Sequence, residues 1–433
     1  MELQTRNLII DTQFFIKNIL DFNNLSLQKL QKLIQEGSVK LYLTDITIDE
    51  ISKKIIELLP ASFGKLNVRD CQYLKVIPAF NKFMQEYNNQ KLIDEVQTNF
   101  EQFLENCQVH IISSDDVKVL DIYKMYTAIK PPFSESKKKE FPDAFALEAI
   151  RIWSEKEKIS AYLLSQDSDW INYINTHYPP NNAKHPSLFC LDDLSSFIDS
   201  IIRDDKELEQ KVILADAEFS ENWNSIKKFI MRKVNEFVFE SDGLDDEEVV
   251  NTFLIDCNLV DKDILEVQQN SALYDLSIKI DAIVEFKVPN YERAVWDSED
   301  QIYYNLKYSQ IYSKHIFDLN ITIDFSFDGN FEINGIDFPA KFIYVPYIEE
   351  SEIIDIDMWT QNLPVIICGV DDNGIITKDG SGFIEFENFQ KAKEVFPELE
   401  IDTASENFTN ALGNKITDPL RFESWKALEY YST

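Results

Sequence analysis

Glycine is scarce in this sequence, and the chain has no glycine-rich phosphate-binding loop. Ten of its 433 residues are glycine, well below the usual share of about 7%. Neither GxGxxG nor GxxxxGK followed by Ser or Thr occurs. Both motifs place backbone N–H groups against phosphates at the start of a helix. We therefore expect no nucleotide-binding site of the P-loop or dinucleotide type.

Cysteine and histidine are few and scattered. The cysteines are odd in number and form no CxxC pair, and the histidines show no ligand spacing. These residues are Cys71, Cys107, Cys190, Cys257, Cys368, His110, His177, His185 and His315. A disulfide framework needs paired cysteines, and a thiolate zinc site needs ligands at short, regular intervals. The sequence predicts neither.

Long apolar runs are also missing. No stretch approaches the roughly 18 consecutive apolar residues of a membrane-spanning helix. The first residues, MELQTRNLII, contain no basic segment followed by a cleavable apolar core. We therefore expect a cytoplasmic protein without a membrane anchor.

The chain carries a large negative charge, and this charge is unevenly distributed. Residues 1–203 hold 23 Lys and Arg against 28 Asp and Glu, a net charge of −5. Residues 204–433 hold 19 against 48, a net charge of −29. An acidic surface repels nucleic-acid phosphates, but cations bound to a few acids in the first part would make its charge close to zero. The length also exceeds the ~250–300 residues of a single core, so we expect two domains, 1–203 and 204–433.

The first part alternates short apolar runs with helical patterns. Strand-like runs are NLII (7–10), KLYLTD (40–45), VHIISS (109–114), ISAYLLSQ (159–166) and LFCL (188–191). Leucines three and four residues apart predict core-facing helices between them. Repeated strand–helix units predict a parallel α/β sheet, and the long polar pattern at about 61–107 predicts a helical insertion.

The second part has a different pattern. Residues 204–240 have helical spacing, whereas residues 272–345 alternate apolar and polar positions and contain the turn signals FDGN and ING. The closing segments FQKAKEVFPELE and PLRFESWKALEYY again have helical spacing. We therefore expect an acidic α+β domain with an antiparallel sheet and a helical end. Its role is not indicated by any motif.

Five acids of the first part lie at predicted element ends. Asp11 closes the first strand, Glu50 lies in the helix ITIDEISKKI, Asp143 opens the helix after residue 140, and Asp167 and Asp169 follow the strand at 159–166. Parallel sheets bind ligands at the carboxyl ends of their strands. Clustered carboxylates repel one another unless a cation neutralises them, and Mg²⁺ and Mn²⁺ prefer oxygen ligands. The five acids therefore predict a divalent cation site.

Each acid also has an ordinary structural interpretation. Asp11 and Asp143 are good helix N-caps, and Asp167 and Asp169 can form an Asx turn. Either Asp49 or Glu50 can flank the apolar stripe of its helix. Lys137, Lys138 and Lys139 form either a solvated run or a contact for a phosphate backbone.

The first part resembles a PIN-like nuclease domain over about residues 5–200. The resemblance rests on LIIDTQFFI, ITIDEISKKI, PPFSESKKKEFPDAFAL and LLSQDSDW, which occur in the family's order. The third piece is similar to bacterial PIN-like proteins with a helical insertion. The resemblance implies a three-layer α/β/α fold and a Mg²⁺- or Mn²⁺-dependent endonuclease, usually acting on RNA.

The resemblance also implies residue roles. The implied metal ligands are Asp11, Glu50, Asp143 and Asp167, with Asp169 as a fifth or outer ligand. Thr12 and Ser165 match hydroxyl positions that orient the site. Apart from the resemblance, the position of Lys137, Lys138 and Lys139 directly before Asp143 predicts contact with a substrate backbone. Gln13 departs from the pattern, because a small polar residue or Asn is commoner there.

Three functions follow from these patterns. The favoured one is an endoribonuclease whose acidic second part controls access or binds a protein partner. If the acidic part masks the site, a chain ending near residue 203 should cleave faster. The second is a catalytically inactive PIN-like scaffold or binding module. The third is a DNA-cleaving defence nuclease or a toxin. The sequence leaves open RNA against DNA, one metal against two, and the oligomeric state.

Overall fold

The computed structural model divides the chain into two compact units, which we describe separately. The first comprises Met1–Ala217, Asp263–Asp275 and Ser326–Asn330, and the second comprises Glu218–Lys262, Leu276–Phe325 and Phe331–Thr433. The structure describes residues 3–66, 70–135, 137, 140–178, 186–241, 247–291, 294–297, 302–346, 353–354, 365–370, 375–377, 383–384 and 420–422.

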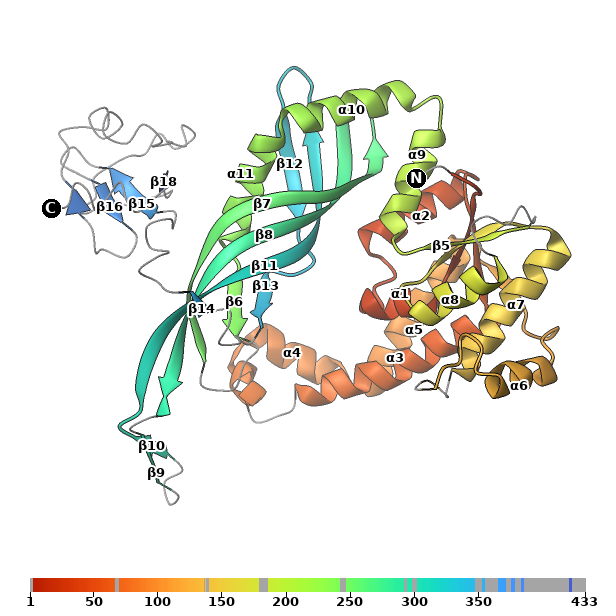
Figure 1. Ribbon diagram of the computed structural model, residues 1–433, viewed down its shortest axis with the longest axis horizontal. Helices are drawn as coiled ribbons and strands as arrows, with labels where there is room; N and C mark the ends of the chain where they lie inside the picture. Colours follow the sequence, from red (N-terminus) through yellow and green to blue (C-terminus); the bar gives the residue numbers. More distant parts are fainter. Residues whose placement is uncertain are drawn as a thin grey trace. The chain divides into compact units, whose positions relative to one another are not determined.

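A five-stranded parallel sheet forms the centre of the first unit (Figure 1). Its strands are β1 (Asn7–Ile10), β2 (Lys40–Thr44), β3 (His110–Ile112), β4 (Ala161–Leu164) and β5 (Leu188–Leu191). They lie in the order β3-β2-β1-β4-β5. All are short apolar runs, as expected for strands buried on both faces of a parallel sheet. The predicted α/β parallel fold is confirmed.

Helices cover both faces of this sheet. They are α1 (Thr12–Lys17), α2 (Leu25–Gln35), α6 (Val119–Thr127), α7 (Phe141–Glu157), α8 (Ser168–His177) and α9 (Leu194–Asp204). On one face, Ile9 and Leu163 share a core with α7 and α8. On the other face, Tyr162 contacts Phe197 of α9, with 5.6 Å between ring centroids. Tyr162 and Leu163, which are successive residues of one strand, therefore pack against opposite helical layers.

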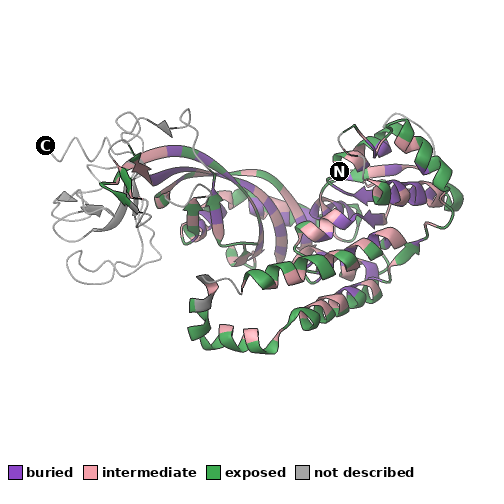
Figure 2. Cartoon of the chain, turned by 90° about the horizontal axis from the view of Figure 1, so that it is seen from below, coloured by how far each residue is buried: buried purple, intermediate pink, exposed green. Residues whose placement is uncertain are grey.

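A helical arm lies between β2 and β3, where the sequence predicts an insertion. It consists of α3 (Asp45–Lys65), the 3-10 helix η1 (Asp70–Val76), α4 (Pro78–Glu86) and α5 (Asn89–Asn106). Figure 2 shows it mostly exposed, and α4 has no buried residue. Phe100 and Phe103 on α5 anchor it to Phe22, with ring-centroid distances of 5.0 and 5.9 Å.

Long antiparallel strands dominate the second unit. After α10 (Glu209–Glu221) and α11 (Trp223–Val234), the sheet has the order β12-β11-β8-β7, and β14 also pairs with β11. Its strands are β7 (Glu248–Val267), β8 (Ser271–Asn290), β11 (Lys307–Ser326), β12 (Glu332–Asp337) and β14 (Ile353–Ile354). Leu276, Ile278 and Ile280 are buried and alternate with less buried residues. This alternation is expected when one face of a sheet covers a core. The antiparallel region predicted for the C-terminal part is confirmed.

Shorter strands complete this unit. Strand β13 (Phe342–Val345) pairs in parallel with β6 (Val238–Ser241), and β9 (Val295–Asp297) pairs with β10 (Ile302–Tyr304). A four-stranded sheet contains β15 (Val365–Val370), β16 (Ile375–Thr377), β17 (Phe383–Ile384) and β18 (Leu420–Phe422).

Some element predictions differ from the structure. In the second part, the sequence pattern gives no strand before residue 272. The structure has β6 from Val238, at the end of the predicted helical segment 204–240, and β7 from Glu248. A strand's length follows from the neighbours available for pairing, which local alternation does not report. Of the predicted helical end, residues 389–400 lie outside the described residues, and Leu420–Phe422 forms a strand because it pairs with β15.

No helix of the described ranges is long and apolar enough to cross a membrane.

Candidate active site

The site begins where the topology of the sheet changes direction. Strands β1 and β4 are neighbours, and the chain extends from β1 toward β3 on one side and from β4 toward β5 on the other. Such switch points leave a crevice at the carboxyl ends of the strands. Asp11 follows β1 and Ser165 follows β4. The Asp11 amide donates to the Leu164 carbonyl over 3.1 Å, and the Ser165 hydroxyl donates to Asp11 Oδ2 over 2.8 Å.

Asp11 is a buried carboxyl group, only 4% exposed. Its pKa is raised from 3.8 to about 6, chiefly by burial; the Ser165 hydrogen bond opposes this rise, and the nearby Asp167 charge makes a small contribution to it. The amides of Thr12 and Gln13 also favour the charged form, although Asp11 makes no side-chain capping bond to α1. The Ser165 hydroxyl is therefore the side-chain group that holds this aspartate.

Glu50 is held beside Asp11 by Thr12, the residue that follows Asp11. Thr12, at the start of α1, donates through its hydroxyl to Glu50 Oε2 over 2.9 Å. Glu50 is half-buried, whereas Asp49 is exposed. The buried face of α3 consists of Thr47, Ile51 and Ile55. Of the two adjacent acids, Glu50 is therefore the one that points to the site.

Asp143 reaches the same region from the first turn of α7. The Trp170 indole N–H donates to Asp143 Oδ1 over 2.9 Å. The Asp143 pKa is raised to about 7, chiefly by burial. The Trp170 hydrogen bond lowers it, while a hydrogen bond shared with Glu140 and the charges of Asp11 and Glu50 contribute to the rise. These electrostatic effects show that Asp143 lies near both acids.

Asp167 and Asp169 lie at the start of α8 and contact a lysine. Asp167 is the N-cap of α8, with Oδ1 accepting from the Asp169 amide over 2.8 Å, and its own amide donates to Ser165 Oγ over 3.1 Å. The Asx-turn interpretation therefore describes part of its role. Lys137 Nζ lies 2.6 Å from Asp169 Oδ2 and 3.5 Å from Asp167 Oδ1. The hydrogen bond to Asp169 raises the Lys137 pKa.

Lys138 and Lys139, which the sequence pairs with Lys137 in a substrate role, lie outside the described residues.

The chemistry of the donor set fits a hard cation. Three acids each have one carboxylate oxygen held by a side-chain donor: Asp11 by Ser165, Glu50 by Thr12, and Asp143 by Trp170. Such supporting hydrogen bonds orient metal ligands, and a nearby cation would offset the cost of burying these charges.

Gln13 follows Asp11 by two residues, and its buried Oε1 atom meets no hydrogen-bond partner in the described part of the chain. Within those same residues, however, no three Asp, Glu, His or Cys side chains form a group that could hold an ion. The residues therefore fit the cation by their chemistry and not by a closed ligand shell.

Sequence reasoning missed two residues of this site. Trp170 is 2% exposed and fixes Asp143, and Glu140 shares a hydrogen bond with that same carboxyl group. The signal for Trp170 was available, because it follows Asp169 on the apolar face of a helix and a buried indole N–H needs an acceptor. Glu140 carries no comparable signal.

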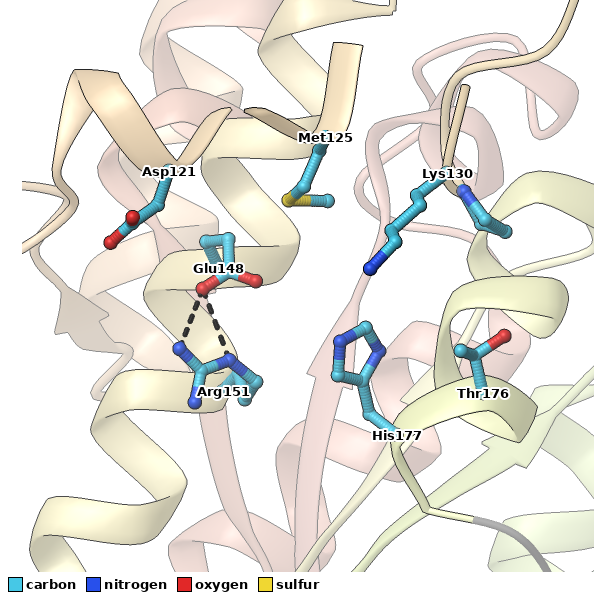
Figure 3. Close-up of a pocket in the computed structure, with 8 residues that line it drawn as sticks. Asp121, Met125, Lys130, Glu148, Arg151, Thr176 and His177 are labelled. Atoms are coloured by element: carbon cyan, nitrogen blue, oxygen red, sulfur yellow. Dashed lines mark hydrogen bonds and ion pairs between the residues drawn. The ribbon is translucent and has the colours of Figure 1, made fainter. Parts of the chain in front are cut away.

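A separate cavity of about 330 Å³ lies between α6, α7 and α8 and contains none of the five predicted acids. Its lining residues are Asp121, Met125, Lys130, Pro131, Glu148, Arg151, Thr176 and His177 (Figure 3). Glu148 Oε2 accepts from Arg151 over 2.7 and 3.0 Å, and Glu148 Oε1 accepts from Tyr173 over 2.7 Å. Its buried acid is thus paired with an arginine, which identifies a structural network.

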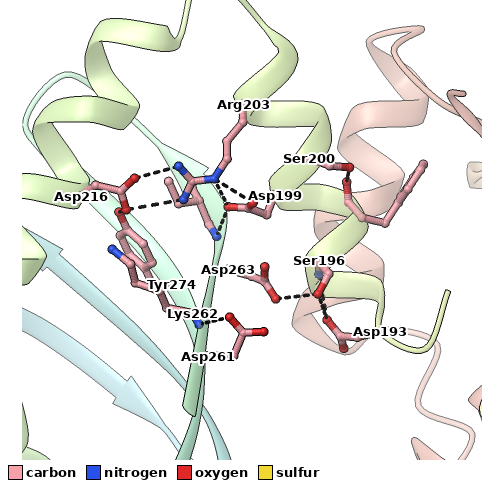
Figure 4. A network of polar contacts seen from close by, with 12 residues as sticks. Asp193, Ser196, Asp199, Ser200, Arg203, Asp216, Asp261, Lys262, Asp263 and Tyr274 are labelled. Atoms are coloured by element: carbon pink, nitrogen blue, oxygen red, sulfur yellow. Dashed lines mark hydrogen bonds and ion pairs between the residues drawn. The ribbon is translucent and has the colours of Figure 1, made fainter. Parts of the chain in front are cut away.

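A polar network joins α9 to the end of β7 and the start of β8 within the first unit (Figure 4). Arg203 Nε donates to both oxygens of Asp199 over 2.8 Å, and Asp199 also accepts from the Ile264 amide over 3.0 Å. Arg203 binds Asp216, which accepts from the Tyr274 hydroxyl over 3.0 Å. Residues beyond 203 therefore complete the first unit.

Comparison with known proteins identifies the family of this region. No curated protein and no solved structure matches the chain. Residues 8–170 match the PIN domain family, and this range contains all five acids together with Thr12 and Ser165. PIN domains are a family of nucleases that act on nucleic acid and typically use divalent metals. The N-terminal part of the chain, over residues 8–170, belongs to the PIN domain family.

Proposed function

We propose that the protein is a metal-dependent endonuclease that hydrolyses phosphodiester bonds, with RNA favoured over DNA as substrate. The observation that carries the proposal is the grouping of Asp11, Glu50 and Asp143 at the β1–β4 switch point. Membership of residues 8–170 in a nuclease family supports it. The preference for RNA rests on the family resemblance alone.

The residue roles follow from the contacts. Asp11, Glu50 and Asp143 would hold Mg²⁺ or Mn²⁺, and Asp167 and Asp169 flank this set because Lys137 engages both of them. Ser165 and Thr12 fix the orientations of Asp11 and Glu50. Lys137 contacts the substrate backbone, a role that we extend to Lys138 and Lys139 from their sequence position.

The reaction is an in-line displacement at phosphorus. The oxygen of a water molecule bonds to phosphorus and loses one proton to solvent as the bond to the leaving oxygen breaks, and the leaving oxygen takes up a proton from solvent. When bound, a hard divalent cation supplies Lewis acidity that polarises the phosphate and makes water more acidic. The protein supplies fixed carboxylates, whose geometry is set by Ser165, Thr12 and Trp170 before substrate arrives.

The acidic C-terminal part serves as a regulatory or partner-binding domain in this proposal. Its support is the net charge of −29 over residues 204–433, which repels nucleic acid and attracts basic surfaces. A chain shortened at residue 203 is a poor test of masking, because it loses Ile264 and Tyr274 from the first unit. Both residues belong to the network around Asp199 and Asp216.

The deciding experiment incubates the full chain with labelled RNA and DNA, with Mn²⁺ or with chelator. We expect Mn²⁺-dependent cleavage of RNA that Asp11→Asn and Asp143→Asn abolish. Asp49→Asn is the matched control, because Asp49 is an exposed acid on the same helix as Glu50 and should cleave normally. A folded, metal-loaded protein that cleaves neither nucleic acid would refute the proposal and favour an inactive scaffold.

A further inference from the structure

Lys137 occupies a fixed place in the loop that precedes α7. Its amide donates to Ser134 Oγ over 3.1 Å, and its carbonyl accepts from the Ser134 amide over 3.2 Å. These two bonds close a small loop and hold the Lys137 backbone. Its side chain then spans to α8, with Nζ 2.6 Å from Asp169 Oδ2 and 3.5 Å from Asp167 Oδ1.

The five acids are neutralised unequally. In the described part of the chain, Lys137 is the only basic residue that forms an ion pair with any of them, and it binds Asp167 and Asp169. Asp11, Glu50 and Asp143 receive hydrogen bonds from neutral donors instead. One side of the cluster therefore contains its own cation, and the other side does not.

We propose that the Lys137 ammonium group serves as the second cation of the site, so that the site takes one divalent ion, on the side of Asp11, Glu50 and Asp143. The inference rests on the proposed nuclease function. It specifies the number of metal ions, which neither the sequence nor the family match determines.

Charge and geometry both support this division. In two-metal sites the ions lie about 3.5–4 Å apart and stabilise the attacking and leaving oxygens. A second divalent ion between Asp167 and Asp169 would have to displace a lysine that already binds both carboxylates. An ammonium group has three N–H donors. Two of them serve Asp169 and Asp167, which leaves the third for a phosphate oxygen.

Access from solvent is consistent with this role. The Lys137 side chain is 43% exposed, whereas those of Asp167 and Asp169 are 23% and 13% exposed. The amine therefore lies at the rim of the cluster, where a phosphate can approach it. Lysine binds phosphate as a point charge, so the contact does not require a particular base sequence.

The test counts Mn²⁺ ions bound to the full chain, by calorimetry or by electron paramagnetic resonance after chelator treatment. We expect one ion for the wild type, two for Lys137→Ala, and one for Lys137→Arg, which keeps the charge. Lys130→Ala is the matched control, because Lys130 is an exposed lysine of the same loop and should leave the count at one. A wild-type count of two overturns the inference, and so does a count of one with unchanged affinity in folded Lys137→Ala.

Cleavage gives an independent readout. Removing a positioned donor to transition-state charge costs about 100-fold or more in rate, so Lys137→Ala should lose about that much at low Mn²⁺ and recover part of it at high Mn²⁺. Lys137→Arg should retain most of the rate. If ion counts follow the expectation but no nucleic acid is cleaved, the proposed function fails and the ion assignment stands. If cleavage occurs with two ions in the wild type, the ion assignment alone fails.

Discussion

Two regions of the first unit bury carboxylates, and they neutralise them in different ways. Around α9, Asp199 is 5% exposed and binds Arg203 through both oxygens. At the β1–β4 switch point, Asp11 is 4% exposed, and among the described residues its side-chain donor is the neutral Ser165 hydroxyl. The two acids are equally buried, but only Asp199 of this pair is neutralised by a cationic side chain. This difference distinguishes the acid of a structural ion pair from the acid that we propose as a metal ligand.

The buried acid of the cavity is neutralised by an arginine, as Asp199 is. Glu148 is 6% exposed and binds Arg151. Breaking a buried pair leaves an uncompensated charge, which is strongly unfavourable. Asp11 and Asp143 bear a comparable cost in the metal-free protein, which is visible in their raised pKa values. Perturbed groups of this kind are typical of functional sites.

The largest change in stability should come from breaking the ion pair between Arg203 and Asp199. Arg203→Ala leaves Asp199 buried without its cation, so we expect a loss of about 3–5 kcal/mol of unfolding free energy. Urea denaturation at neutral pH measures it. The double variant Arg203→Ala with Asp199→Asn should recover much of the loss. An Arg203→Ala protein as stable as the wild type would show that Arg203 does not compensate the buried charge of Asp199, so that the two regions do not differ in this respect.

The pH dependence should distinguish the uncompensated region. The folded pKa of Asp11, about 6, lies above its ordinary value of 3.8, so between these values the folded state binds more protons than the unfolded state. Stability therefore falls as pH rises from about 4 to above 6, by about 3 kcal/mol for Asp11 alone at roughly 1.4 kcal/mol per pKa unit. Asp143, with a pKa of about 7, extends the fall. Urea denaturation in chelator should show this slope, and Asp11→Asn should flatten it.

A bound metal ion should stabilise the uncompensated acids around Asp11, as Arg203 stabilises Asp199. A ligand at 100 times its dissociation constant stabilises the folded state by about 2.7 kcal/mol. We expect Mn²⁺ to raise the melting temperature of the wild type and of Arg203→Ala, and to leave Asp11→Asn unchanged. Stabilisation of Asp11→Asn equal to that of the wild type would place the ion elsewhere.

The smallest effect, a loss of Mn²⁺ affinity, should come from removing the neutral hydroxyl donors. Ser165→Ala and Thr12→Ala remove the hydroxyl groups that orient Asp11 and Glu50, and such supporting contacts are worth about 10–100-fold in metal affinity or activity. Mn²⁺ titration measures the change. Ser113→Ala is the control. The Ser113 hydroxyl accepts a hydrogen bond from the Asp115 amide in a loop after β3, so this variant also removes a bonded hydroxyl group. Unchanged Mn²⁺ affinity in both variants would show that the two hydroxyl groups do not orient the metal ligands.

The sequence predicted the parallel sheet because each strand is a short apolar run and each helix has its own periodic stripe. It also placed Asp11 directly after β1, and Asp167 follows β4 at the start of α8. Helical periodicity did not choose between Asp49 and Glu50, since adjacent helical residues point in directions only ~100° apart, whereas the family resemblance favoured Glu50. Likewise, it gave no strand at β7, because the pairing of β7 with β8 determines its extent.

Local pattern by itself determined the α/β order of the first part, the acidity of the second, and the acids available for a metal. Tertiary structure alone decided which of those acids are compensated. Lys137 reaches Asp169 across 32 residues, Ser165 reaches Asp11 across 154, and Trp170 reaches Asp143 across 27. Periodicity reports which face of an element is buried, but the partner of a buried charge depends on which backbone segments the folded sheet brings together.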